Sequence, residues 1–110
     1  MAKKVQFFQG EQINVTINGN DIYNLDTINF GCVIYPVEDL TKKLRVQKSE
    51  MTKTNTNQYI ASFRPIDTKN LPVGIYNIEM YDDTNKMIYQ QQNSFNISNS
   101  ASADYITTNL

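Results

Sequence analysis

Short runs of alternating apolar and polar residues, each closed by a turn signal, constrain this chain more than any other feature. In residues 13–17, three apolar side chains alternate with Asn and Thr, and this period of two is typical of a half-buried strand. The sequence Gly-Asn-Asp at 19–21 then ends the run, because Gly and Asn tolerate the positive φ of turns. A period of 3.6 persists nowhere beyond a single turn, so the sequence predicts an all-β domain.

The same pattern recurs along the chain and predicts a sandwich. The run from Ile28 to Tyr35 is apolar on both faces, which indicates a central strand, and Pro36 ends it because proline has no N–H for the ladder. A polar patch from Gln90 to Asn93 indicates a bulge or an edge in the last run. About seven short strands in about 95 residues favour an immunoglobulin-like β-sandwich, with a small Greek-key barrel as the structural alternative. Further strands are expected at 5–8, 42–50, 59–63, 76–80 and 87–97, and the Thr, Lys and Asn residues of 52–57 are expected to form an exposed hairpin tip.

Size, charge and cysteine content narrow the class of protein. The chain has 110 residues and a net charge of −1, so we expect one domain and no nucleic-acid partner. Cys32 is the one cysteine, which excludes an intrachain disulfide and indicates a reducing compartment. Its place on the central strand predicts a buried core residue, with a nucleophile as the alternative. No apolar run has the length of a signal peptide or membrane span, so we expect a soluble protein made in the cytoplasm and no membrane partner.

Few residues are suited to chemistry. The absence of histidine removes the commonest general base and His-based triads, and one cysteine cannot form a structural zinc site. Glu38-Asp39 and Asp82-Asp83-Thr84-Asn85 are interpreted as turns, with a calcium site as the alternative for the second. The basic stretch 42–48 is interpreted as a solvated strand face rather than a nucleic-acid site. The sequence therefore predicts no enzyme, no catalytic residue, no metal site and no cofactor.

One local motif supports the fold. In Leu71-Pro72-Val73-Gly74-Ile75-Tyr76, Gly74 permits a sharp entry into a strand, and Tyr76 then points into the sandwich. Its hydroxyl can donate to the backbone of residues 67–74, so Leu71, Gly74 and Tyr76 resemble the tyrosine corner of immunoglobulin-like domains. The motif predicts structure and carries no functional information.

The order of segments resembles a family. The polar strand at 12–17, the turn Tyr-Asn-Leu-Asp-Thr at 23–27, the apolar strand at 28–35 and the corner at 67–76 are similar to small immunoglobulin-like domains of tailed-bacteriophage virion proteins. Examples are auxiliary capsid proteins of crAss-like phages and the N-terminal domain of baseplate upper proteins. The resemblance covers residues 5–97 and implies a structural protein present in many copies on a virion, with no catalytic residues.

Three functions are therefore weighed. The first is an auxiliary or decoration capsid protein that binds the major capsid protein by protein–protein interaction, because the chain reads as one module. The second is a tail or baseplate adaptor, although such proteins usually add a fibre-forming region. The third is a carbohydrate-binding module, which the absence of tryptophan disfavours.

The last residues differ from the domain. We expect a sandwich over 1–97 and an extension over 98–110, whose small polar residues read as a linker. Tyr105, Ile106 and Leu110 are predicted to dock on a neighbouring virion protein, with the tail backbone adding a strand to its edge. On this interpretation, removal of the extension weakens capsid binding and leaves the unfolding of the domain unchanged.

Overall fold

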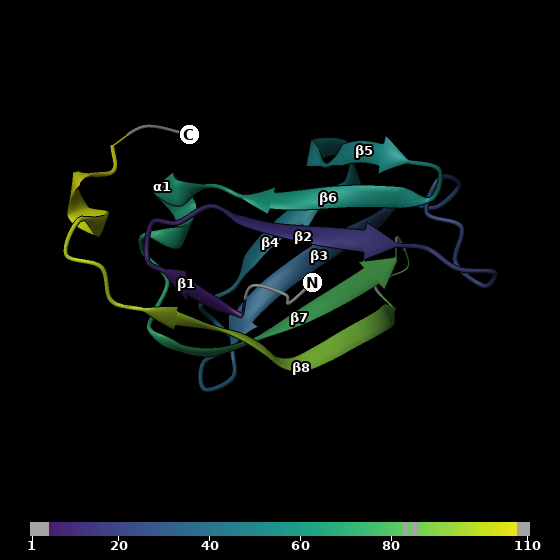
Figure 1. Ribbon diagram of the computed structural model, residues 1–110. Coiled ribbons are helices and arrows are strands. Elements are labelled where there is room, and N and C mark those ends of the chain that lie inside the picture. Colours follow the sequence, from purple (N-terminus) through teal and green to yellow (C-terminus); the bar gives the residue numbers. More distant parts are fainter. Residues whose placement is uncertain (1–4, 83, 85, 108–110) are drawn as a thin grey trace.

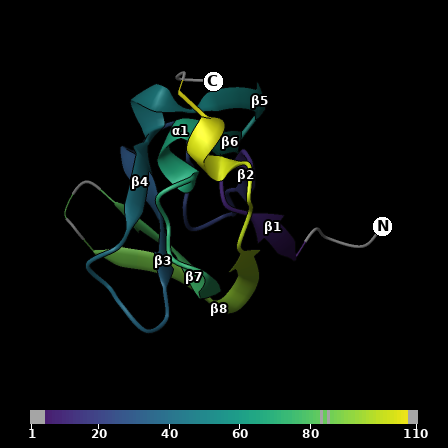
Figure 2. The same cartoon turned by 90° about the vertical axis from the view of Figure 1, so that its left-hand side faces the viewer.

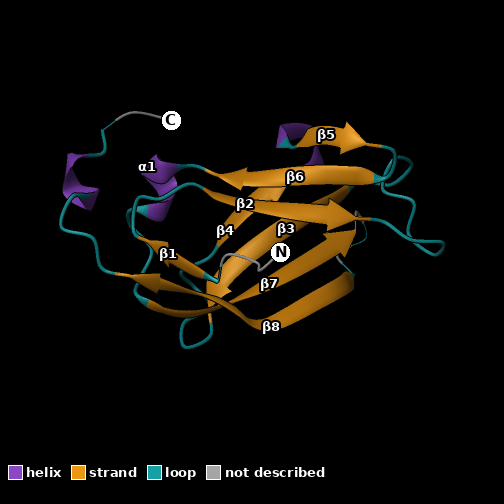
Figure 3. Cartoon of the chain, in the orientation of Figure 1, coloured by secondary structure: helices purple, strands orange, loops and turns teal. Residues whose placement is uncertain are grey.

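The computed structural model describes residues 5–82, 84 and 86–107, and its strands form two sheets that pack face to face (Figures 1 and 3). Within these residues the strands are β1 (Gln6–Phe8), β2 (Ile13–Asn18), β3 (Phe30–Pro36), β4 (Leu44–Gln47), β5 (Thr52–Asn55), β6 (Gln58–Phe63), β7 (Gly74–Asp82) and β8 (Met87–Ser98). One sheet has the order β1-β8-β7-β3-β4 and the other the order β2-β6-β5. The protein is all-β, and its architecture is the predicted immunoglobulin-like sandwich, with an eighth strand.

The eighth strand is β5, which lies where a hairpin tip was expected. Its four side chains are all exposed, so no alternation marks it in the sequence. It forms because its backbone pairs with β6, where Lys53 lies opposite Tyr59 and a register shift follows. The prediction of an exposed hairpin tip over 52–57 was therefore right for residues 56–57, which form the turn, and wrong for residues 52–55, which form the exposed strand β5.

Within residues 5–82, 84 and 86–107, helical structure is confined to single turns. They are η1 (Lys48–Glu50), α1 (Pro65–Thr68) and η2 (Ala103–Tyr105). Pro65 follows the end of β6 and opens α1, because at the first helical position its missing N–H costs no hydrogen bond.

The strand β3 is central, as its two apolar faces predicted. It pairs with β4 on one side and with β7 on the other. Cys32 and Ile34 on its inner face are fully buried, and burial raises the pKa of the Cys32 thiol to about 12. Cys32 is therefore a core residue, because a thiol with this pKa is not ionised at neutral pH.

The aromatic centre of the core contains the predicted corner. Tyr76 is fully buried, stacks on Phe95 at a centroid distance of 5.3 Å, and donates its hydroxyl hydrogen to the Pro72 carbonyl oxygen at 2.5 Å. Gly74 has a φ of +139°, a value that residues with a Cβ rarely adopt, and Leu71 is buried beside the turn. The three residues thus occupy the positions that the Leu-Pro-Val-Gly-Ile-Tyr pattern predicted.

The polar patch in β8 is the predicted bulge. The register between β7 and β8 shifts between Tyr76 and Ile78, and Asn93 adopts a φ of +50° there. The Asn77 side-chain oxygen accepts a hydrogen bond from the Asn93 N–H at 2.8 Å. A side chain of the neighbouring strand therefore satisfies a backbone donor that the bulge removes from the ladder.

The C-terminal residues fold back onto the domain, which corrects the expectation for Ile106. Figure 2 shows η2 in front of α1, and the Lys69 ammonium at the end of α1 donates to the Ile106 carbonyl oxygen at 2.6 Å. The Ile106 side chain fills the space beside Gly10, where a Cβ would lie 2.2 Å from its terminal carbon. Ile106 is therefore part of this domain and not a free anchor, whereas Tyr105 is 82% exposed and Leu110 lies outside the described residues.

We predict that Tyr76→Phe lowers the free energy of unfolding by about 1 kcal/mol, because it removes one buried hydrogen bond and leaves the Pro72 carbonyl without that donor. Chemical denaturation measures the change. Tyr105→Phe, at an exposed position, is the control and should change stability by less than about 0.5 kcal/mol. Equal effects of the two substitutions would contradict the role given to the corner.

We also predict that Cys32 of the native protein reacts with a thiol reagent only at the rate at which the protein unfolds. Its thiol is buried and, with a pKa of about 12, scarcely ionised. The reaction is followed by mass spectrometry with and without denaturant. Rapid labelling of the native protein would show that β3 opens to solvent.

Candidate functional site

No metal-binding cluster is found in the described part of the chain. It holds no group of three or more Cys, Asp or Glu side chains placed to bind a metal ion. The Asp39 carboxylate accepts hydrogen bonds from the Thr41 N–H and hydroxyl, and Asp82 accepts from the N–H groups of Thr84 and Lys86. Both carboxylates thus close local turns, as the turn interpretation predicted, while Asp83 and Asn85 lie outside the described residues.

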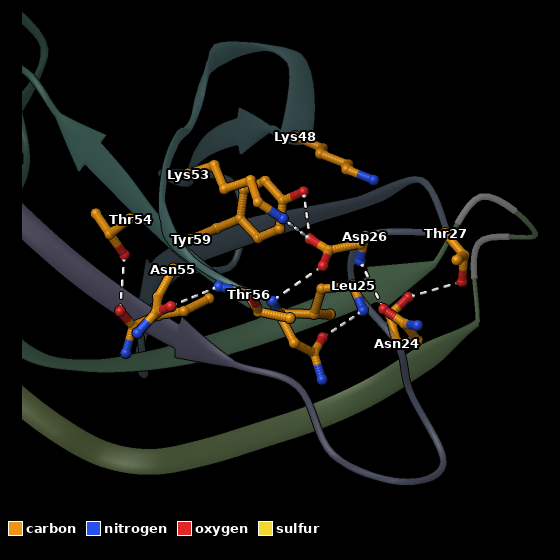
Figure 4. Close-up of polar contacts among 12 residues, drawn as sticks. Asn24, Leu25, Asp26, Thr27, Lys48, Lys53, Thr54, Asn55, Thr56 and Tyr59 are labelled. Carbon is orange, nitrogen blue, oxygen red and sulfur yellow. Dashed lines mark hydrogen bonds and ion pairs between the residues drawn. The ribbon is translucent and has the colours of Figure 1, made fainter.

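The Asp26 carboxylate is the centre of a hydrogen-bond network at one end of the sandwich (Figure 4). Asp26 lies in the long loop between β2 and β3 and accepts hydrogen bonds from the Lys53 ammonium, the Tyr59 hydroxyl at 2.9 Å and the Asn57 N–H at 3.0 Å. The Asn57 side-chain oxygen accepts from the Leu25 N–H at 2.6 Å. The bond from Lys53 and then that from Tyr59 hold the pKa of Asp26 below its ordinary value. This network ties the loop to the β5–β6 hairpin.

Lys48 strengthens the same end of the molecule and accounts for part of the basic stretch. Its ammonium donates to the Ile28 carbonyl oxygen at 2.7 Å and lies 5.5 Å from the centroid of the Tyr59 ring. This is a cation–π distance. Lys48 therefore packs on the domain, and we interpret the Asp26 network as structural.

The two outer faces of the sandwich differ in character. The outer face of the three-stranded sheet carries mainly polar side chains, among them Asn14, Thr16, Asn18 and Ser62, with Ile60 as a partly exposed apolar residue. On the outer face of the five-stranded sheet, named here the five-stranded face, several large apolar side chains are about half exposed or more. They are Phe8 (53%), Leu40 (62%), Ile75 (49%) and Met87 (53%). A sheet face with uncovered apolar side chains is a candidate interaction surface.

A hollow of about 530 Å³ lies on the five-stranded face. The strands β3, β4 and β7 and the turn before β4 supply its lining, which combines apolar, aromatic and charged groups: Val33, Tyr35, Leu40, Lys43, Arg45, Glu79 and Tyr81. Lys43 and Arg45 are exposed, and no described residue forms an ion pair with either of them or with Glu79.

The carboxylate of the hollow is held by a polar network. Tyr35 is 5% exposed although it points away from the core, and its hydroxyl donates to the Glu79 carboxylate. The Gln90 amide donates to both the Tyr35 hydroxyl and Glu79, each at 3.0 Å. The Asn77 amide donates to the same hydroxyl at 3.3 Å. These bonds fix the direction of the Glu79 carboxylate before any ligand arrives.

Gly31 determines how Tyr81 lies in the hollow. A Cβ at position 31 would lie 2.3 Å from the Tyr81 hydroxyl oxygen and 2.7 Å from a ring carbon. The Tyr81 side chain therefore rests directly on the backbone of β3, an approach that only glycine permits. The glycine inside this apolar strand is the sequence feature from which a close approach to its backbone could have been predicted.

The predicted site residues do not belong to this hollow. Tyr76 lies in the core, and Tyr105 lies on η2 beside the β1–β2 connection. The sequence-based predictions did not include Tyr35, Glu79 or Tyr81. Each of them is an ordinary polar or aromatic residue of a strand, and only the pairing of β3 with β7 brings the three together.

Comparisons with known proteins bear on the fold alone. No protein-family model matches the chain, and no curated protein matches it. Among solved structures it is similar to a "putative glycoside hydrolase" from Bacteroides vulgatus ATCC 8482, with a TM-score of 0.55 and 10% sequence identity. The match covers 89% of this chain and 17% of that protein, so the likeness concerns one domain of a much longer chain. Within the described residues, no helix is long and apolar enough to cross a membrane.

We predict that Asp26→Asn lowers stability at neutral pH and makes stability less sensitive to acid. A carboxyl whose pKa is lower in the folded than in the unfolded state stabilises the fold above its unfolded pKa of about 3.9. That contribution disappears as the pH falls through the folded pKa. Thermal unfolding from neutral to acidic pH measures the effect, and Asp21→Asn, at an exposed position of the same loop, is the matched control. Identical pH profiles for Asp26→Asn and the original chain would contradict the role of this network.

Proposed function

We propose that this chain is a structural protein of a tailed-bacteriophage virion, an auxiliary capsid protein that docks on the major capsid protein through its five-stranded face. The proposal is supported by the resemblance of its segment order to virion domains. The observation that carries it is the difference between the two outer faces, one mainly polar and one with several large apolar side chains that are about half exposed or more.

The five-stranded face has the composition of a protein-binding surface. Protein interfaces combine an apolar and aromatic centre, often with arginine, and a polar rim. Here Leu40 and Tyr81 lie beside Arg45 and the fixed Glu79 carboxylate. Such a surface gives a partner both apolar area to bury and oriented charges that select the register of docking.

The C-terminal residues make a smaller contribution in this proposal than the sequence predicted. Ile106 packs against the domain beside Gly10. Of the three predicted anchor residues, Tyr105 is therefore the one described side chain that is exposed to a partner. Deletion of 98–110 would also remove the buried Ala103 and the Ile106 contact, so a point substitution is the cleaner test.

We predict that Leu40→Asp weakens binding to capsids at least about ten-fold, because loss of a central apolar anchor typically costs about 2 kcal/mol or more. Leu40 is 62% exposed, so the fold should persist. Ile22→Asp, at an 82% exposed position of the β2–β3 loop, is the matched control and should bind as the original chain does. Co-sedimentation with capsids that lack the protein measures binding, and Tyr105→Ala tests the C-terminal turn in the same assay.

Equal capsid binding by Leu40→Asp and the original chain would overturn the role of the five-stranded face. Failure of the original chain to bind capsids while it binds tails or baseplates would favour the adaptor function. Electron microscopy distinguishes the two locations, because capsid binding places several copies around each capsomer and an adaptor forms a ring at the tail.

The hollow itself favours carbohydrate binding as the second candidate. A tyrosine side chain that rests on the backbone of β3, next to a fixed carboxylate and an arginine, offers both an apolar surface and hydrogen-bonding groups to a sugar. Calorimetry with a panel of oligosaccharides tests this function. Sugar binding that is lost in Tyr81→Ala, together with no capsid binding, would replace the first proposal by this one.

A further inference from the structure

The sheets have four edges, and β2 differs from the other three edge strands. The edge strand β1 has only three residues, while β4 and β5 carry Arg45 and Lys53. Short length and charged residues are the usual devices that keep an edge from pairing with another chain. The strand β2 has six residues, Ile-Asn-Val-Thr-Ile-Asn, with no charge and no proline. Its edge lacks all of these devices.

The backbone of β2 presents a regular set of hydrogen-bonding groups at this edge. The Gly19 N–H donates to the Asn57 carbonyl oxygen at 2.8 Å, which extends the β2–β6 ladder by one pair. Because antiparallel ladders alternate, the odd-numbered residues of β2 direct their N–H and C=O groups to β6. The even-numbered residues Asn14, Thr16 and Asn18 therefore direct theirs away from β6. No described strand pairs with them there.

The space beside this edge is uncharged and lined by both apolar and polar side chains. Two hollows of about 290 and 280 Å³ adjoin each other between β2 and the five-stranded sheet, and share Val15 and Ile78 in their linings. Neither lining contains an Asp, Glu, Lys or Arg. Val15 and Ile88 are only partly buried against the core. A strand added to β2 would therefore cover the partly exposed side chains of Val15 and Ile88, and it would find no charged side chain there to pair with a charge of its own.

We infer that β2 pairs antiparallel with β2 of a second copy of this chain, around a two-fold axis that passes beside Thr16. Thr16 then lies opposite Thr16 of the second copy, and Asn14 lies opposite Asn18. This is the register in which all the outward-directed residues face one another, and each such pair exchanges both of its N–H···O bonds. The contact is isologous, because both copies contribute the same strand. Pairing covers the β2 edge of each copy, so assembly through this edge ends at a dimer.

The side chains of β2 are complementary to themselves in this register. On the outer face, threonine lies opposite threonine and asparagine opposite asparagine, and such pairs can form hydrogen bonds across strands. On the inner face, Val15 lies opposite Ile17 of the second copy, above the uncharged hollows. No like charges meet, because β2 carries none. The strand β2 of a second copy, which is uncharged and alternates polar and apolar residues, is thus a suitable partner for this edge.

Hydrogen exchange of single amides tests this pairing in the unmodified protein. In the free chain the amides of Asn14, Thr16 and Asn18 should exchange rapidly, and those of Val15 and Ile17, bonded to β6, slowly. We expect protection of the even-numbered amides to rise at least ten-fold from micromolar to millimolar concentration. Over the same range, sedimentation equilibrium should show a mass rising from 12.7 kDa toward twice that value.

Two substitutions at one position isolate the edge. Thr16→Pro removes an N–H that points away from β6, so the β2–β6 ladder is retained while the dimer pairing is broken. Thr16→Val keeps the N–H and the strand propensity and is the matched control. We expect Thr16→Pro to remain monomeric at millimolar concentration and Thr16→Val to dimerise. Circular dichroism checks that both variants fold, and if Thr16→Pro does not, the exchange measurement on the original chain decides.

Three results would overturn the inference. The first is a monomer whose even-numbered amides exchange rapidly at every concentration. The second is protection of these amides that does not depend on concentration, because the edge would then be covered within one chain. The third is a dimer that persists in folded Thr16→Pro, which would place the contact elsewhere.

Discussion

The ladder between β3 and β7 is the constraint on which the rest of the structure depends. Its register sets Cys32 opposite Met80 and Ile34 opposite Ile78 on the inner face, and these pairs form the middle of the core. The same register sets Gly31 opposite Tyr81, Val33 opposite Glu79 and Tyr35 opposite Asn77 on the outer face. The core and the candidate site are thus two sides of one set of pairings. A slip of one residue would exchange the two sides and destroy both.

The outer side of this ladder carries a polar network that orients the Glu79 carboxylate. Tyr35 is buried on a face where a smaller polar residue would remain solvated, and its hydroxyl bonds to side chains from β7 and β8. In the described residues every buried side-chain nitrogen or oxygen has a hydrogen-bond partner, so burial of these groups carries no unsatisfied polar atom. A carboxylate held in this way loses little conformational freedom when a partner binds, which lowers the entropic cost of association.

Local patterns predicted the fold well, and long-range pairing explains what they missed. Alternation located the runs that became β2, β3 and β6, and the two apolar faces of β3 indicated its central place. The strand β5 carries no alternation, because its side chains are solvated on both faces and the backbone of β6 induces it. The contact of Ile106 with Gly10 joins residues far apart in sequence, and so does the hollow, whose lining comes from β3, β4 and β7. Spacing along one segment contains no information about such contacts.

The two proposed surfaces lie on different sheets, and together they have a consequence that neither has alone. Antiparallel pairing within a sheet requires a two-fold axis perpendicular to that sheet, so a dimer formed through β2 keeps corresponding faces on the same side. The five-stranded faces of the two copies would then point in one direction and could engage one surface at two places. Binding of the second face becomes intramolecular after the first has bound, which typically raises overall avidity about 10²–10⁴-fold without any new contact. A moderate single-site affinity would therefore suffice for stable attachment to a repeating lattice such as a capsid, provided that neighbouring binding sites match the spacing of the two faces.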